Sequence, residues 1–219
     1  PKDPRVVARG NERVLQARLS DAKFFFEEDQ RVPFIQRLEG LKKVVYHSKL
    51  GSSYEKVMRI SRLADYLTEA IDPSLGETVK RASLLCKADL ITGMVGEFPT
   101  LQGVMGGVYA RLSGEEEAVA LAICEHYLPT SAGGVLPSSH PGAILSIADK
   151  LDTIVGCFGV GLIPTGTADP HALRRQTLGV IHIILEKRYP LSLGRLLERS
   201  LELLADKIER PDREIKADV

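Results

Sequence analysis

Apolar side chains recur at helical spacing along nearly the whole chain. The clearest stripe consists of Val57, Ile60, Leu63, Leu67 and Ile71, which follow one another every three or four residues and so line one face of a helix. Glycine and serine residues precede this stripe and an Asp-Pro pair follows it, as is typical of helix ends. No run alternates convincingly between apolar and polar residues, as a half-buried strand would. The pattern therefore predicts an all-α fold.

The same spacing predicts further helices and one long loop. Helices are expected over residues 11–30, 34–45, 82–95, 115–127, 169–187 and 191–208. Residues 143–157 are mostly apolar, which predicts a buried central helix. The Pro-, Gly- and Ser-rich residues 129–141 are expected to form a loop. Asp169 is expected to cap the helix that follows it, with Pro170 in the first helical position.

Three segments are predicted from these elements. Residues 1–31 are expected to form a connecting helical arm, because an acidic run and then a proline end the first helix. Residues 32–207 are expected to form the main domain, and residues 208–219 a charged C-terminal tail. The first residue is Pro1 instead of methionine, which is typical of a segment of a longer protein.

Composition narrows the classes of function. The chain has 219 residues with 29 basic and 29 acidic side chains, so no net charge attracts it to nucleic acid or membrane, and any anion site must be a local patch. Aromatic residues make up only 5%, which favours helices over an all-β sandwich. The three cysteines lie far apart in apolar runs, as expected for buried thiols in a reducing cytoplasm. No apolar run reaches the roughly 20 residues of a membrane helix.

Three motifs resemble the ligand motifs of HD-type metal phosphohydrolases. The helix around Lys56 resembles the first ligand helix of that superfamily, with lysine in the place of the usual histidine. The following His-Asp pair corresponds to Cys86 and Lys87, whereas the last ligand survives as Asp149 in an Ala-Asp-Lys-Leu context. The resemblance implies a helical bundle of the HD type with a degenerate ligand set.

The two lysines bear directly on metal binding. A catalytic dication needs several converging anionic or imidazole ligands, and an ammonium group at about 4 Å opposes it by several kcal/mol. We therefore expect no bound metal, no catalytic residue and no hydrolase activity. Lys56, Lys87 and Asp149 are expected either to form an ion-pair cluster in the vacated site or, alternatively, to point separately to solvent.

Other motifs give little support to catalysis. The five histidines show no metal-binding spacing, and His126, at a predicted helix end, is expected to bond to backbone carbonyl groups. Gly103, Gly106 and Gly107 follow no strand and lack the ending of a phosphate loop, so they are expected to permit close helix packing or an irregular turn. No cysteine has a convincing basic partner.

Basic residues are densest on and just after the helix that starts near Asp169. The candidates for contact with an RNA backbone are His171, Arg174, Arg175, Lys187 and Arg188. The alternative is that Arg174 or Arg175 pairs with an internal carboxylate of Asp149, Asp152 or Asp169 and stiffens the turn.

Short sequence motifs, occurring in the same order over nearly the whole chain, resemble those of the bacterial glycyl-tRNA synthetase β subunit. They include KADL at 87–90, QGVMG at 102–106, ADKLDT at 148–153 and DPHALRR at 169–175. The resemblance implies a fragment containing the HD-like domain of a tRNA-binding subunit. Its implied partners are the tRNA for glycine, the α subunit and the remainder of the β subunit.

The resemblance also implies that the chemistry lies elsewhere. In the complete cytoplasmic ligase, ATP and Mg would be used by the α subunit, so this fragment would hold no cofactor and be inactive alone. Its role would be non-catalytic, in tRNA recognition and subunit architecture. Two alternatives stay open: a purely architectural domain without tRNA contact, and an active metal-dependent phosphohydrolase.

Overall fold

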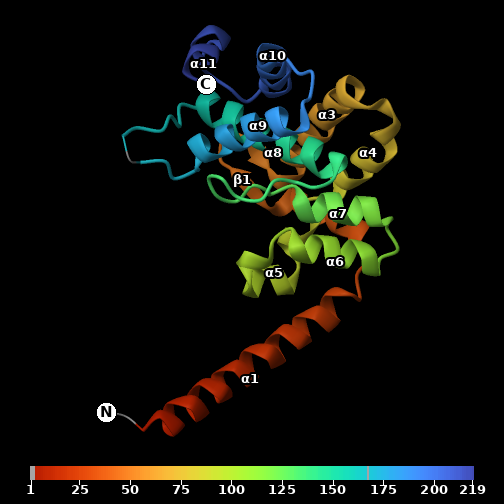
Figure 1. Cartoon of the computed structure of the whole chain (residues 1–219), viewed down its shortest axis with the longest axis vertical. Coiled ribbons are helices and arrows are strands. Elements are labelled where there is room, and N and C mark those ends of the chain that lie inside the picture. The colour runs from red at the N-terminus through yellow and green to blue at the C-terminus, as the bar shows by residue number, and fades with distance from the viewer. Residues whose placement is uncertain (1–2, 167) are drawn as a thin grey trace.

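Helices carry nearly all of the regular structure, which is seen in a computed structural model describing residues 3–166 and 168–219 (Figure 1). The α-helices in this part are α1 (Pro4–Asp29), α2 (Arg37–Gly40), α3 (Ser53–Ile71), α4 (Gly76–Leu85), α5 (Gly93–Glu97), α6 (Val104–Leu112), α7 (Glu117–Glu125), α8 (His140–Gly159), α9 (Leu173–Lys187), α10 (Leu193–Leu204) and α11 (Asp212–Asp218). The 3-10 helices are η1 (Phe34–Gln36), η2 (Leu41–Lys43), η3 (Pro73–Leu75), η4 (Ala88–Ile91) and η5 (Pro99–Leu101). The expected all-α class is confirmed, whereas the HD type stays a prediction.

Helix α8 is the centre of the fold, as the apolar run over 143–157 predicts. All of its residues except His140 and Thr153 are buried. It packs against α3, α4, α7, α9, α10 and α11, which surround it. Because α8 is enclosed, the polar side chains that it carries must find partners inside the protein.

Helix α3 packs against α8 and has a well-defined start. The Ser52 side chain accepts a hydrogen bond from the backbone N–H of Glu55, and the Glu55 carboxylate accepts one from the backbone N–H of Ser52. This capping box fixes the first turn of the helix. The apolar stripe of α3 is buried as predicted, except that Ile71 at its end is half-buried. Two of the helix's basic residues, Lys56 and Arg59, are also buried.

A short antiparallel hairpin precedes α3 and was not predicted. It pairs β1 (Val45–His47) with β2 (Gly51–Ser52), and Val45 lies opposite Ser52. Its strands are too short to show a period of two in the sequence. Gly51 has a φ of +91°, which suits glycine and allows the tight reversal.

The stretch over 82–95 is not one helix, contrary to the prediction. Helix α4 ends at Leu85, η4 follows, and Thr92 caps α5 by accepting the backbone N–H of Val95. The break places Lys87 beyond the end of α4, where its side chain turns into the protein interior.

Glycines allow α6 and α7 to pack closely, as predicted. A Cβ atom on Gly107 would lie 2.8 Å from the Ala120 carbonyl oxygen, and one on Gly106 would lie 2.9 Å from Ile123 Cγ2. Both distances are too short for a larger residue. Buried Asp89 accepts the backbone N–H of Gly103 at 2.6 Å, at the start of α6.

Helix α9 begins later than predicted. It starts at Leu173, not at Pro170, after Ala172 adopts a left-handed conformation with φ of 53°. The Asp169 carboxylate nonetheless accepts the backbone N–H groups of Leu173 at 2.7 Å and Arg174 at 3.0 Å. Asp169 therefore satisfies free helical N–H groups from a position outside the helix.

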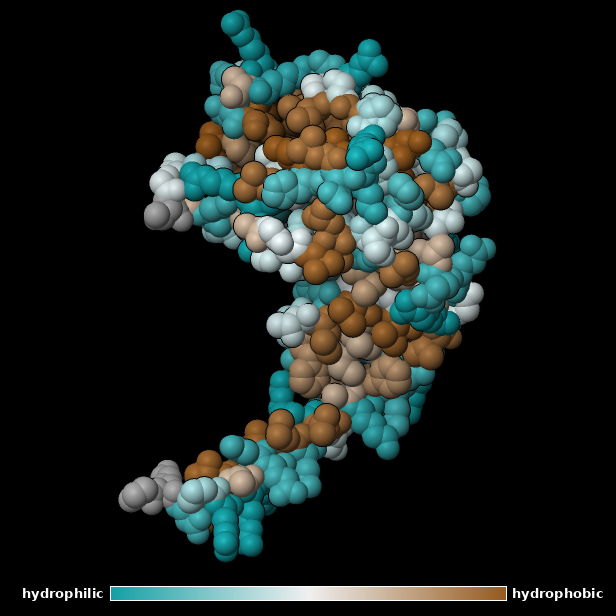
Figure 2. Space-filling view, in the orientation of Figure 1, coloured by the Kyte–Doolittle hydropathy of each residue, from teal (hydrophilic) through white to brown (hydrophobic). Residues whose placement is uncertain are grey.

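Helix α1 projects away from the rest of the molecule as an arm (Figure 1). Apolar side chains gather on the side of the arm that faces the body, and polar ones on the other side (Figure 2). Large exposed apolar residues of α1 are Val6, Val7, Val14, Leu15, Leu19 and Phe24. At the other end of the chain, the charged segment 208–219 contains α11, whose Ile215 is buried beside α8. The division into arm, domain and tail stays a prediction.

Within the described residues, no helix has the length and apolar character required to cross a membrane.

Candidate functional site

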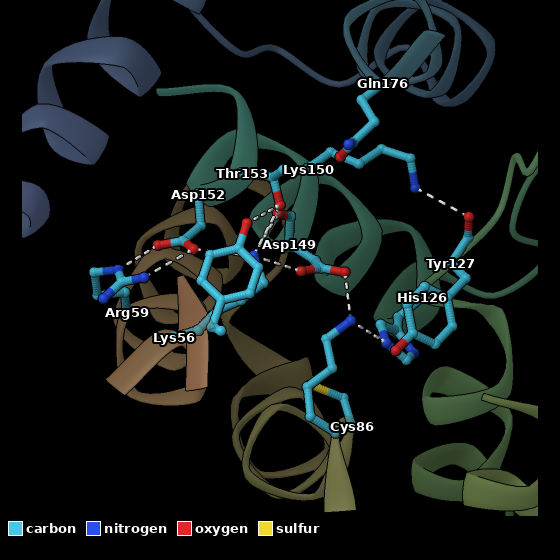
Figure 3. Close-up of polar contacts among 12 residues, drawn as sticks. Lys56, Arg59, Cys86, His126, Tyr127, Asp149, Lys150, Asp152, Thr153 and Gln176 are labelled. Carbon is cyan, nitrogen blue, oxygen red and sulfur yellow. Dashed lines mark hydrogen bonds and ion pairs between the residues drawn. The ribbon is translucent and has the colours of Figure 1, made fainter. Parts of the chain in front are cut away.

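Four residues resemble HD-type ligand positions, and three of them, Lys56, Lys87 and Asp149, meet at the middle of the molecule. Lys56 Nζ lies 3.0 Å from Asp149 Oδ1, and Lys87 Nζ lies 2.7 Å from Asp149 Oδ2. All three residues are buried, with exposed fractions of 5%, 4% and 7% for Lys56, Lys87 and Asp149. The predicted ion-pair cluster is therefore confirmed, and the solvent-pointing alternative is wrong (Figure 3).

A second carboxylate extends the cluster. Asp152 Oδ2 lies 3.0 Å from Lys56 Nζ, and Asp152 Oδ1 lies 2.5 Å from Arg59 Nε. Arg59 also donates to Asp152 Oδ2 at 3.2 Å and to the Leu50 carbonyl of the hairpin at 3.1 Å. The guanidinium thus holds the carboxylate through two parallel bonds.

The sequence contained a signal for this second pair. Lys56 and Arg59 are three residues apart on α3, and Asp149 and Asp152 are three residues apart on α8. Residues at this spacing share one face of a helix. Two basic residues on one helix therefore match two acidic residues on the helix that packs against it.

His126 is buried against Lys87. The Nε2 atom lies 2.9 Å from Lys87 Nζ, and Nδ1 lies 2.5 Å from the Ile123 carbonyl oxygen. Burial, followed by the charge of Lys87, holds the pKa of His126 well below its usual value, so the ring is neutral. We assign Nε2 as the acceptor and Nδ1–H as the donor, which confirms that His126 bonds to a carbonyl group at the end of α7.

The ionisation states follow from the contacts. Burial would raise the pKa of Asp149, but the charges of Lys56 and Lys87 outweigh it and hold that pKa well below the usual range. Burial would likewise lower the pKa of Lys87, but the charge of Asp149 raises it above the usual value. Asp149 is thus an ionised carboxylate that two ammonium groups neutralise.

This set of donors does not fit a divalent metal. Within residues 3–166 and 168–219, no three His, Cys, Asp or Glu side chains are placed to hold an ion. A dication on Asp149 would meet both ammonium groups, each opposing it by about 8 kcal/mol at 4 Å and an effective dielectric of 20. The fourth HD-like residue, Cys86, instead donates to the Ser83 carbonyl at 3.2 Å, and burial raises its thiol pKa to about 12.

Lys150 is a further buried cation that the sequence pattern did not indicate. Its Nζ donates to the Leu128 carbonyl at 2.8 Å, the Ser146 hydroxyl at 2.8 Å and the Tyr127 carbonyl at 3.3 Å. Within the described chain, no carboxylate lies at ion-pair distance from this amine. Burial therefore lowers the pKa of Lys150 to about 8.

The lowered pKa of Lys150 predicts a pH-dependent stability. The unfolded chain keeps the proton up to the ordinary lysine pKa of about 10.4, whereas the folded chain releases it near 8. Between these values the unfolded state binds more protons, so stability rises with pH, by about 3 kcal/mol in total. The free energy of unfolding of the unsubstituted chain and of Lys150→Met is measured in urea at several pH values from 7 to 10.5. The unsubstituted chain should gain stability relative to the variant as the pH rises. A difference in stability that does not change with pH would contradict this prediction.

The predicted RNA-binding residues occupy two ends of α9. His171 and Arg175, near its start, line a cavity beside the cluster. Lys187 and Arg188 lie at its other end, about 20 Å along the helix axis from Arg175. Lys187 donates to the Ser138 carbonyl at 2.7 Å, and Arg188 is exposed.

Arg174 has a different environment from Arg175. Its guanidinium donates to the carbonyl groups of Gly166 at 2.6 Å and Pro164 at 3.3 Å, which holds the loop before α9. Among the described residues, neither arginine makes a salt bridge to Asp149, Asp152 or Asp169. The alternative of a pairing with an internal carboxylate is wrong, although Arg174 does hold the turn through carbonyl groups. Arg175 is exposed.

Comparison with known proteins identifies the family. The chain matches, over residues 1–219, the family described as glycyl-tRNA synthetase beta subunit. It is 61% identical to the glycine–tRNA ligase beta subunit of Trichlorobacter lovleyi and 60% identical to that of Syntrophus aciditrophicus. Each alignment covers 100% of this chain and 32% of the relative, so the chain spans about a third of those proteins. The chain belongs to the glycyl-tRNA synthetase beta subunit family.

Proposed function

We propose that this chain is a non-catalytic domain of a glycine–tRNA ligase beta subunit and that it contributes to tRNA recognition and subunit architecture. Family membership supports the ligase assignment. The observation that carries the non-catalytic role is the Lys56–Asp149–Lys87 cluster, in which ammonium groups occupy both oxygens of the carboxylate. A metal-dependent hydrolase would need those oxygens as ligands.

The proposed partners follow from this assignment. They are the tRNA for glycine, the α subunit and the remainder of the beta subunit, in the cytoplasm. ATP and Mg would be used by the α subunit, and this domain would position the RNA. The exposed Arg175 guanidinium supports an RNA contact, because its planar fork can donate two hydrogen bonds to a phosphate group.

Charge reversal on α9 tests the proposed tRNA contact. In the complete ligase, Arg175→Glu combined with Lys187→Glu and Arg188→Glu should weaken tRNA binding about tenfold or more. The slope of log affinity against log salt should fall by about 1 for each phosphate that the triple variant no longer neutralises. Filter binding across a salt series measures both quantities.

The matched control reverses three exposed basic residues of the arm, Arg9→Glu, Arg13→Glu and Lys23→Glu. It changes the net charge by the same amount but lies outside α9. Unchanged affinity and salt slope in the α9 triple variant would exclude a phosphate contact by its residues. A loss equal to that of the arm triple variant would show a general charge effect instead.

A purely architectural role is the second candidate. Arg174 and Lys187 donate to loop carbonyl groups, and the arm exposes an apolar stripe that could contact the other parts of the ligase. In that case the α9 variants would lower thermal stability or assembly, while the tRNA affinity of the assembled complex would stay unchanged. The phosphohydrolase alternative would require one equivalent of tightly bound Mn, Fe or Ni together with turnover of a phosphodiester.

A further inference from the structure

A cavity of about 520 Å³ opens beside the ion-pair cluster. Its volume lies in the range of small-molecule binding sites. Its wall comes from α3, α8, α9 and the loops after α4 and α7. Figure 3 shows several of the lining residues, among them Lys56, Tyr127, Asp149, Lys150 and Gln176. The basic and acidic side chains of the wall are Lys56, Lys87, Lys150, Arg175 and Asp149, and His171 also lines the cavity.

The cavity wall carries an excess of positive charge. Four of its side chains are lysine or arginine and one is acidic. Behind the wall, Arg59 and Asp152 form a pair that adds no net charge. The next acid, Asp89, is buried, and burial raises its carboxyl pKa. Arg175 is exposed, so the buried wall residues Lys56, Lys87, Lys150 and Asp149 leave two positive charges, or one where Asp89 is ionised.

Uncompensated buried charge is costly for a protein. Lys56, Lys87 and Lys150 are each at most 5% exposed. The chain therefore holds this excess charge out of water next to an open cavity. An anion with two negative charges would neutralise it, and a phosphate monoester carries about that charge at neutral pH.

The buried lysines and Arg175 would act differently on such an anion. Lys56 and Lys87 already donate to Asp149, Asp152, Thr153 and His126, so they contribute their electric field. Arg175 is exposed at the cavity, where its guanidinium can approach a phosphate group in a bidentate geometry. The cavity thus combines fixed positive charge with a movable donor.

Neutral side chains complete the wall. Tyr46 and Tyr127 line it, and each ring already has a lysine ammonium over one face, at 4.6 Å for Lys56 and 3.8 Å for Lys87. Gln102 and Gln176 supply amide groups that can both donate and accept hydrogen bonds. Aromatic rings beside amide groups suit a nucleobase or sugar attached to the phosphate.

We propose that this cavity binds a phosphate monoester carried by a nucleotide, either a free mononucleotide or the 5′ end of an RNA, with Arg175 as its direct ligand. The proposal goes beyond the proposed role in tRNA recognition and does not depend on it. Contact with an RNA backbone uses phosphodiesters on a surface, whereas this site would bind a terminal dianion inside a cavity.

Calorimetry with the full 219-residue chain tests the site. AMP, adenosine and inorganic phosphate are titrated at low salt with EDTA present, so that no metal can mediate binding. AMP should bind, and adenosine should bind about tenfold more weakly or worse, because it lacks the charged group. Absence of AMP binding at millimolar concentration, or equal binding of adenosine, would overturn the proposal.

Two surface variants locate the site. Arg175→Gln should weaken AMP binding about tenfold or more, since it removes the charged donor. Thr130→Trp changes an exposed residue of the cavity wall and should block entry without changing charge. The matched control, Arg188→Gln at the far end of α9, should leave AMP affinity unchanged. Unchanged affinity in the first two variants would place AMP elsewhere and overturn the proposal.

Oligonucleotides distinguish the two sources of the phosphate. A 5′-phosphorylated trinucleotide that binds more tightly than AMP would support the site and identify its ligand as an RNA end. Tighter binding of AMP would also support the site and identify its ligand as a free nucleotide. Thr130→Trp also separates the nucleotide site from the proposed tRNA contact. It should abolish AMP binding, while tRNA binding by the complete ligase should still depend on Lys187 and Arg188.

Discussion

Replacing Lys87 by methionine should lower the free energy of unfolding by about 3–5 kcal/mol, the usual cost of breaking a buried ion pair. Lys87 Nζ lies 2.7 Å from Asp149 Oδ2 and 2.9 Å from His126 Nε2. The substitution removes the donor to both atoms and leaves Asp149 with Lys56 as its remaining ammonium partner. Methionine has a similar volume, so the decrease would report charge and hydrogen bonding more than packing. Urea unfolding at pH 7 measures it.

Two further variants test whether the loss of stability comes from the buried cluster. Lys87→Met combined with Asp149→Asn should recover part of the stability, because the buried carboxylate charge is then removed with its partner. Lys216→Met breaks an exposed pair with Glu198, whose side chains are 38% and 58% exposed, and should change stability by less than about 1 kcal/mol. If Lys87→Met costs no more than Lys216→Met, the cluster does not support the fold as described.

The pH dependence of the cluster has a definite sign. The folded-state pKa of Asp149 lies below its unfolded value. Its contribution to stability is therefore present above the unfolded carboxyl pKa of about 3.9 and is lost as pH falls through the folded pKa. Lys150 acts in the alkaline range instead, so the two groups affect stability in separate pH windows.

The sequence predicted the helices that carry a strong apolar stripe. Helix α3 was predicted because its apolar period extends over several turns, and central helix α8 because apolar residues dominate 143–157. The hairpin and the break between α4 and α5 were missed because each spans only a few residues, too short for a periodic signal. The start of α9 was misplaced because Asp169 bonds to the helical N–H groups from outside the helix, an arrangement that depends on the loop path.

The candidate site was predicted only in part, because it depends on contacts between segments that lie far apart in the sequence. The resemblance of two lysines and Asp149 to HD-type ligand positions predicted an ion-pair cluster around Asp149, and the structure contains it. Arg59 and Lys150 were not predicted. The spacing of Lys56 and Arg59 matches that of Asp149 and Asp152, but only the packing of α3 against α8 shows that the two pairs face each other. Arg59 meets a carboxylate of another helix, and Lys150 meets loop carbonyl groups near Pro129. A single sequence does not specify which side chains from distant segments meet.

Replacing Asp29 by alanine should also destabilise the protein by about 3–5 kcal/mol, because it leaves several buried donors without an acceptor. The Asp29 carboxylate, at the end of α1, accepts backbone N–H groups of Gly93 at 2.8 Å and Met94 at 2.9 Å, and the Tyr109 hydroxyl at 2.8 Å. Arg37 Nη2 also donates to the Asp29 carbonyl oxygen at 2.6 Å. Urea unfolding measures the overall decrease in stability.

These bonds join the arm to the body, so the same substitution should expose the junction. In limited proteolysis, the Asp29→Ala variant should be cleaved within residues 29–34 much faster than the unsubstituted chain. The rate of cleavage within α3 and α8 should change only as far as global stability changes. The matched control, Asp21→Ala, removes an exposed carboxylate from the same helix and should leave both measurements unchanged. Equal protection of the junction in both variants would mean that the other contacts between α1 and α5, which include the Arg18–Glu97 salt bridge, hold the arm. An arm fixed by Asp29 instead would transmit the position of α1 directly to α5 and, through Tyr109, to α6.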